Sequence, residues 1–188
     1  MYIYSKQDGN KIIDLGHDSE NSTAESQVKI DAKFDQVVFL GDSITMGYVT
    51  YNKVPVTQVI HKKGLSAEGM FTNNLYYMDD YEELEDILSN FKPKMLYVSF
   101  GMNDLRKSPS EFYEIYKKNI EKLRQLCPNT KIALISITPI NSAEFEISKV
   151  DEFNVKIKQI SQELGNDCFY INIHSLLEDS QGKLKDEY

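Results

Sequence analysis

Three short stretches of small and polar residues carry the side chains that could do chemistry in this chain. The sequence GDS at 41–43 follows the apolar run at 37–40, KGLSA stands at 63–67, and GMND stands at 101–104. A serine hydroxyl can act as a nucleophile, and backbone N–H groups and an asparagine amide can stabilise the negative charge that develops on a carbonyl oxygen during acyl transfer. Brought together, the three stretches would form a site for acyl transfer.

Each stretch would supply a different part of that site. We predict Ser43 to be the nucleophile, at the start of a helix where partial positive charge favours an anion. The oxyanion would be held by the N–H of Ser43, the N–H of Ala67 or a neighbour, and the side-chain amide of Asn103. The supporting residues would be Gly41, Asp42, Gly64, Gly101 and Asp104. We expect the two aspartates among them to brace the loops by hydrogen bonds.

Each stretch taken alone is also typical of an ordinary connection. GDS can form a tight strand-to-helix turn in which Asp42 or Ser43 caps the helix, and the other two stretches can be plain loops. The functional interpretation therefore depends on the fold, because only neighbouring strand ends would bring stretches so far apart in the sequence to one place.

From Phe34 onward the pattern alternates between strands and helices. It predicts strands at 36–40, 56–60, 94–100, 131–137 and 168–173, and helices at 73–91, with a break near Asp79–Asp80, at 109–126 and at 148–164. This alternation predicts an α/β fold, a three-layer α/β/α domain with a flavodoxin-like five-stranded parallel sheet in the order 2-1-3-4-5. In that order the first three strands are neighbours, about 4.8 Å apart, and the three polar stretches follow their carboxyl ends.

Composition and charge narrow the class of protein. The 188 residues carry a net charge of −8, which argues against a nucleic-acid partner, and no apolar run is long enough for membrane insertion. Residues 1–33 are polar and turn-rich, which predicts an N-terminal tail or linker with a short strand at 1–4 or 11–15; residues 34–188 would form the domain. No apolar leader follows Met1, which indicates the cytoplasm unless a leader or anchor precedes these residues.

The three stretches resemble blocks I, II and III of the SGNH hydrolases, also called the GDSL esterase/lipase family. Their order and spacing agree, and the resemblance extends over about 34–188, including FN at 153–154. It implies a serine esterase that removes small acyl groups, such as acetyl, from an ester substrate such as a carbohydrate, through an acyl-enzyme on Ser43 and without a metal or other cofactor. Ala67 stands where the family usually has glycine, and its N–H can still donate if φ is negative.

The catalytic base of the family is missing from the place where the family has it. The resemblance implies an Asp-x-x-His after the fifth strand, and residues 174–188 contain none. We expect the base and acid beyond Tyr188, with a closing helix, so that the domain would be incomplete at its C-terminus. His174 would lie about 14 Å from Ser43 by strand spacing, His61 ends the second strand, and His17 lies in the tail; we favour none of them as the base.

Several alternatives stay open. An O-acyltransferase would use the same acyl-enzyme, and a partner chain could supply the helix and base. A relative that has lost catalysis could still bind a carbohydrate, and a flavodoxin-like loop with Ser43 and Thr45 could hold the phosphate of a flavin. Cys127 and Cys168 lack a metal-type spacing, and reduced thiols are favoured over a disulfide.

Overall fold

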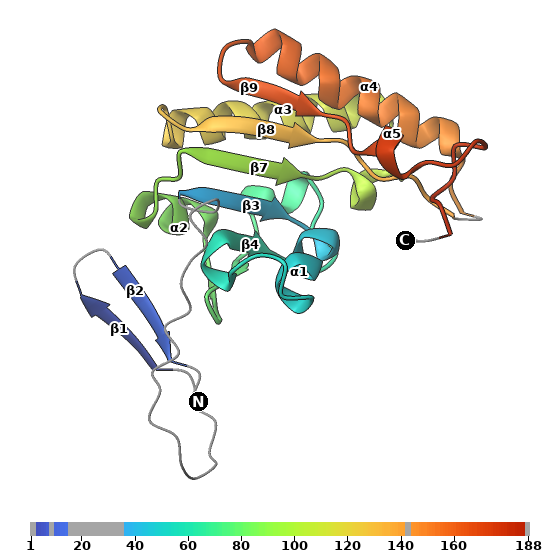
Figure 1. Cartoon of the computed structure of the whole chain (residues 1–188). Helices are drawn as coiled ribbons and strands as arrows, with labels where there is room; N and C mark the ends of the chain where they lie inside the picture. The colour runs from blue at the N-terminus through green and yellow to red at the C-terminus, as the bar shows by residue number, and fades with distance from the viewer. Residues whose placement is uncertain (1–2, 8–9, 15–35, 142–143, 187–188) are drawn as a thin grey trace. The chain divides into compact units, whose positions relative to one another are not determined.

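The computed structural model describes residues 3–7, 10–14, 36–141 and 144–186 of a chain that divides into two compact units (Figure 1). The first unit is Met1–Asp35 and the second is Gln36–Tyr188. In the first, β1 (Ile3–Gln7) and β2 (Asn10–Asp14) pair antiparallel as a hairpin. Two paired strands therefore lie in the segment that the sequence pattern predicts to be a polar tail with one short strand.

Within the described part of the second unit, a seven-stranded sheet has the order β6-β5-β4-β3-β7-β8-β9. Five of these strands pair in parallel and follow the predicted order 2-1-3-4-5. The strands are β3 (Val37–Gly41), β4 (Val59–His61), β5 (Leu75–Tyr77), β6 (Asp80–Glu82), β7 (Met95–Ser99), β8 (Lys131–Ile135) and β9 (Cys168–Ile171). The α/β fold class is confirmed, and the sheet has two strands more than predicted.

The two additional strands correct the helix predicted at 73–91. β5 and β6 form an antiparallel hairpin that continues the sheet from β4, and only α2 (Leu84–Asn90) is helical. Met78 and Asp79 have φ values of 50° and 71°, the backbone of a two-residue hairpin turn. The aromatic residues beside that turn favour strands. The helix-like spacing of this segment was therefore misleading.

The strand predicted at 56–60 is also shorter than expected. A single 3-10 turn, η2 (Val56–Gln58), follows Pro55 and leaves only three residues for β4. Two further 3-10 turns, η3 (Glu68–Phe71) and η4 (Met102–Asp104), follow β4 and β7. These turns matter for the site, because they shape the loops at the carboxyl ends of the parallel strands.

Helices cover the sheet as a three-layer fold requires. α3 (Pro109–Leu126) and α4 (Ile147–Leu164) pack side by side, whereas α1 (Ser43–Thr50) lies over β3 and β4 (Figure 1). α3 begins where predicted, because Ser108 caps it by accepting the Glu111 N–H and proline occupies its first turn. A short helix that the sequence does not predict, α5 (His174–Leu177), follows β9.

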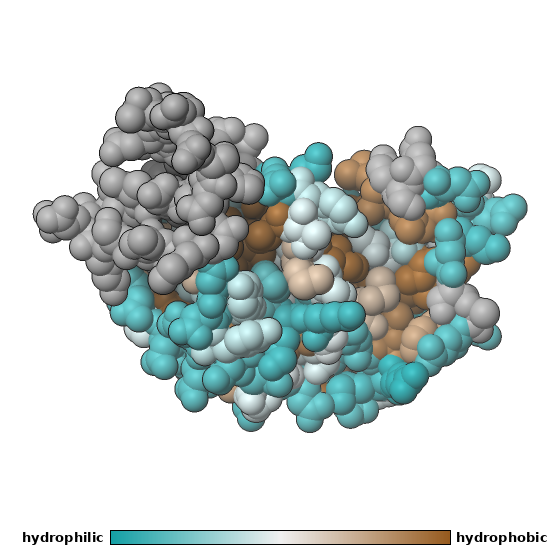
Figure 2. Space-filling model, turned by 90° about the horizontal axis from the view of Figure 1, so that it is seen from below, coloured by the Kyte–Doolittle hydropathy of each residue, from teal (hydrophilic) through white to brown (hydrophobic). Residues whose placement is uncertain are grey.

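The core of this unit is made by the inward faces of the sheet and helices. Strand residues such as Leu40 and Val98 are fully buried, as are Tyr116 and Ile120 of α3. Hydrophobic residues are also visible between hydrophilic ones on the surface seen from below (Figure 2). Among the described helices, none combines the length and the apolar character needed to cross a bilayer.

Candidate active site

Ser43 is the first residue of α1, and Asp42 alone separates it from the end of β3. Asp42 caps the helix, since its Oδ1 accepts the Ile44 N–H at 2.9 Å. The turn requires glycine at position 41, because a Cβ there would lie 2.2 Å from Thr45 Oγ1 and 2.7 Å from the Ser99 carbonyl oxygen. The Ser43 side chain is half-buried, and its hydroxyl has no hydrogen-bond partner among the described residues.

The side chain of Asn103 joins the three polar stretches. Its Nδ2 donates to Asp42 Oδ2 at 2.8 Å and to the Leu65 carbonyl oxygen at 3.1 Å. Asn103 lies in η4, after β7, so these bonds connect the loops that follow three neighbouring strands. The loops therefore converge, as the predicted strand order requires.

Ala67 is held on both sides of its backbone. Its N–H donates to Asp104 Oδ2 at 2.9 Å, and its carbonyl oxygen accepts from Asn119 Nδ2 at 2.6 Å. The residue has φ −55°, so a methyl group is tolerated where the family usually has glycine. Ala67 and Asp104 are both buried.

Two glycines of the predicted supporting set have backbone conformations that side chains rarely adopt. Gly64 has φ 72°, and Gly101 has φ 124°. At Gly101 a Cβ would also lie 2.5 Å from Ile137 Cδ1, so both conformation and space require glycine there. Gly101 therefore allows the chain to turn from β7 into the segment that carries Asn103.

The three predicted oxyanion donors differ in whether they are already paired. The Ser43 N–H, at the first turn of α1, has no acceptor among the described residues. The Ala67 N–H donates to Asp104, and the Asn103 amide donates to two acceptors. A carbonyl oxygen bound beside Ser43 would therefore have to share or replace these protein acceptors to gain the second and third donors.

Two buried carboxyl groups set the electrostatics of the site. Burial raises the pKa of Asp42, and hydrogen bonds from the backbone N–H groups of Ile44 and Asp42 itself partly oppose the rise. Burial likewise raises the pKa of Asp104, while the Ala67 N–H and then the charge of Lys107 lower it. Asp42 accepts the Asn103 amide and Asp104 accepts the Ala67 N–H, so each carboxyl group connects its own loop to a neighbouring one.

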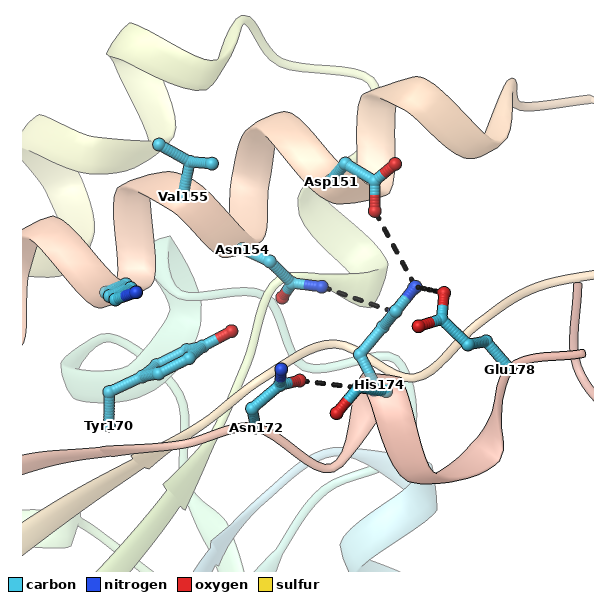
Figure 3. A pocket seen from close by; sticks show the side chains of 9 residues that line it. Asp151, Asn154, Val155, Tyr170, Asn172, His174 and Glu178 are labelled. Carbon is cyan, nitrogen blue, oxygen red and sulfur yellow. Dashed lines mark hydrogen bonds and ion pairs between the residues drawn. The ribbon is translucent and has the colours of Figure 1, made fainter. Parts of the chain in front are cut away.

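His174 lies away from Ser43, in a pocket between α4 and the end of β9 (Figure 3). Its Nδ1 is 3.0 Å from the Ile137 carbonyl oxygen, and its Nε2 is 3.6 Å from Asp151 Oδ1 and 3.5 Å from Glu178 Oε2. β9 is the third strand from β3, which corresponds to about 14 Å. The contacts of His174 are thus with the segment after β8, with α4 and with the residue after α5.

His61 ends β4 and pairs in register with Gly41. It is buried, its ring packs 5.2 Å from that of Tyr76, and burial lowers the pKa of its imidazole. No described residue, His61 included, forms a hydrogen bond with the Ser43 hydroxyl. His17 lies outside the described residues.

The other reactive side chains of the described residues are potential metal ligands and two thiols. No group of three or more described histidine, cysteine, aspartate or glutamate residues could hold a metal ion. Cys127 and Cys168 are buried free thiols, so no disulfide joins them, and burial raises the pKa of Cys168 to about 11. Neither thiol is a reactive thiolate at neutral pH.

Sequence reasoning missed Asn119 and did not use Asn154. Asn119 lies beside the buried stripe of α3 and reaches Ala67, and Asn154 of α4 exchanges two hydrogen bonds with the backbone of Ile137. Both are amides next to an apolar helix face. An amide next to an apolar helix face is the only sign in the sequence that either residue bonds another part of the chain. It does not indicate which loop the amide contacts.

Sequence comparisons identify a family and a relative that this chain resembles. A family model described as the GDSL-like lipase/acylhydrolase family matches residues 39–188. The platelet-activating factor acetylhydrolase IB subunit beta homolog of Drosophila melanogaster is 34% identical over 134 residues, which cover 68% of this chain and 54% of that protein. The chain thus spans about half the length of this curated relative.

Solved structures share the fold at low sequence identity. A GDSL-like lipase from Bacteroides thetaiotaomicron superposes with a TM-score of 0.56 at 20% identity, over 84% of this chain and 78% of the other. A family 3 carbohydrate esterase from Clostridium thermocellum has a TM-score of 0.55 at 13% identity, over 80% of this chain and 87% of the other. Because the family model matches residues 39–188, which is most of the second unit, this chain belongs to the GDSL-like lipase/acylhydrolase family.

Proposed function

We propose that the protein is a serine esterase that removes small acyl groups from an ester substrate through an acyl-enzyme on Ser43. The observation that carries this proposal is the set of hydrogen bonds that ties the GDS, KGLSA and GMND stretches together. The serine in the first stretch is half-buried, and its hydroxyl has no partner in the described part of the chain. Family membership supports the same chemistry. We assign the activity to the domain predicted at 34–188.

In the proposed reaction, Ser43 Oγ attacks the carbonyl carbon of the ester. The carbonyl oxygen becomes negative beside the Ser43 N–H, which is the helix-terminal donor without an acceptor among the described residues. The alcohol leaves with a proton, and water then hydrolyses the acyl-serine. A general base must take the serine proton. We propose the histidine of an Asp-x-x-His as that base, as the family resemblance implies.

The names of similar proteins support a small acyl group. One is called an acetylhydrolase, and another a carbohydrate esterase. We therefore propose an acetyl ester, carried by a carbohydrate, as the substrate class. The half-buried position of Ser43 is consistent with a substrate that approaches from solvent.

The test is hydrolysis of 4-nitrophenyl acetate and of an acetylated sugar by the full-length protein. Ser43→Ala should lower kcat by roughly 1,000-fold or more, because the nucleophile is lost. Ser110→Ala, at an exposed serine of α3, is the matched control and should keep wild-type activity. Mass spectrometry of a quenched reaction should find one acetyl group on the peptide that contains Ser43.

Two results would contradict the proposal. One is a wild-type protein that neither cleaves an acetyl ester nor forms an acyl-enzyme. The other is a Ser43→Ala variant that retains the activity. Adding an unmodified sugar as acceptor separates hydrolysis from transfer, since a transferase would release acetylated sugar instead of acetate.

A further inference from the structure

The segment between β4 and η3 has little regular structure to hold it. Its backbone bonds are local: the Leu65 N–H donates to the Lys62 carbonyl oxygen at 3.2 Å, and the Gly69 N–H of η3 donates to that of Ser66 at 3.1 Å. The peptide groups around Ala67 also bond side chains from elsewhere in the chain. The Ala67 N–H in particular is directed by a side chain outside this segment.

Asn119 is the contact that comes from a long helix, α3. It lies in the middle of α3, next to Tyr116 and Ile120, which are fully buried. Its Nδ2 donates to the Ala67 carbonyl oxygen at 2.6 Å, across 52 residues of sequence. A side chain fixed beside the core in this way can fix the loop that it bonds.

Asp104 and Asn119 hold Ala67 from opposite sides. Asp104 accepts its N–H at 2.9 Å, and Asn119 donates to its carbonyl oxygen. The same carbonyl oxygen also accepts the Met70 N–H at 3.3 Å, so it keeps one partner when Asn119 is removed. Loss of Asn119 should therefore loosen the orientation of the segment without leaving a buried carbonyl unpaired.

We infer that Asn119 is a positioning residue, which sets the direction of the Ala67 peptide groups relative to Ser43. This inference rests on the proposed serine esterase, in which a backbone N–H of this segment stabilises the oxyanion. Asn119 touches neither the substrate nor the reacting atoms. It acts through the backbone of Ala67, to which it donates.

The kinetic test compares two substitutions with one control in the full-length protein. Asn119→Leu removes the donor at similar size, and Asn119→Asp places an acceptor against the Ala67 carbonyl oxygen. Asn129→Asp, at an exposed asparagine after α3, is the matched control. With 4-nitrophenyl acetate we expect kcat to fall about 10- to 100-fold in both Asn119 variants with KM little changed, because a misdirected donor acts on the transition state.

The second measurement does not depend on activity. The Ala67 amide resonance in a ¹H–¹⁵N spectrum should move in Asn119→Leu and stay in place in Asn129→Asp, while thermal unfolding reports that each variant is folded. An unmoved Ala67 resonance, or wild-type kcat in Asn119→Leu, would overturn the inference. If the wild type has no esterase activity, the proposed function fails, and the Ala67 resonance still decides whether Asn119 orients this segment.

Discussion

Asp104 lies buried in the candidate site, with 1% of its surface exposed. Its Oδ2 accepts the Ala67 N–H at 2.9 Å, whereas its Oδ1 has no hydrogen-bond partner in the described part of the chain. Oδ2 therefore fixes the KGLSA segment, whereas Oδ1 is removed from water without gaining a hydrogen bond in the described part of the chain, which costs free energy. Around it, Lys107 lowers the pKa of the carboxyl group, and Glu68 and Asp42 raise it, but burial has the largest effect.

The raised pKa predicts how Asp104 affects stability as pH changes. In the unfolded chain the group titrates near its usual value of 3.8, and in the folded protein it titrates at a higher pH. Its favourable contribution is therefore complete below pH 3.8 and is lost as pH rises through the folded pKa. Asp104→Asn removes this dependence and retains an oxygen for the Ala67 N–H.

We expect the free energy of unfolding of Asp104→Asn, minus that of the wild type, to increase as pH rises from below 3.8 toward neutrality. Urea unfolding over a pH series measures this difference. The unpaired Nδ2 of the new asparagine shifts the whole curve by about 1–3 kcal/mol and does not create the slope. Asp167→Asn, at an exposed aspartate, is the matched control. A flat or falling difference would contradict the expectation.

At the scale of elements, the junction of β3 and α1 is what presents Ser43. The strand ends against the first turn of its own helix, so closely that the position of a Cβ on Gly41 is taken by Thr45 Oγ1 and by the Ser99 carbonyl oxygen. Gly47, four residues into α1, has a different environment, since among the described residues a Cβ there would meet only the Tyr51 ring, at 3.7 Å. The two glycines therefore provide an internal comparison.

Gly41→Ala should destabilise the protein by about 1–3 kcal/mol, because overpacking forces backbone at the junction to move. Gly47→Ala should instead stabilise it by about 0.4–1 kcal/mol, since alanine restricts the unfolded chain and suits a helix. Chemical unfolding of the two variants measures both values. If the two variants change the free energy of unfolding equally, or if Gly41→Ala is as stable as the wild type, the contact at Gly41 can be relieved at little cost.

The elements also show where sequence patterns succeed and fail. α3 was predicted with its observed bounds, because serine and proline mark its start and its apolar spacing is helical throughout. The hairpin of β5 and β6 was missed, because its strands have only three residues each. Such short segments give too few positions to separate a period of two from a period of 3.6.

At the scale of the whole molecule, parallel strand order is what made the convergence of the three loops predictable. Ser43 and Asn103 could be expected to approach because each follows one of two neighbouring strands, β3 and β7. Which hydrogen bonds result could not be predicted. The pairing of Asn103 with Asp42, and of Ala67 with Asp104 and Asn119, depends on loop conformation and on side chains that no spacing rule relates.

The net charge of −8 acts on the whole molecule and predicts which esters reach the site readily. A negative field repels anionic substrates, and salt screens that repulsion, with a Debye length of about 10 Å at 0.1 M. For the proposed esterase, kcat/KM toward an acetylated uronic acid should therefore increase with added NaCl, by up to roughly tenfold. The value for a neutral acetylated sugar should stay constant.

Comparing kcat/KM for the two substrates tests whether the net charge of the protein repels the anionic one. Both carry the same acetyl ester, so any effect of salt on Ser43 or on the fold would change the two values together. Only repulsion between the anionic sugar and the acidic protein changes one and not the other. A parallel response of both substrates would mean that salt acts on the protein itself, which contradicts the expectation. A decrease for the anionic substrate alone would mean that local positive charge outweighs the net charge near the site.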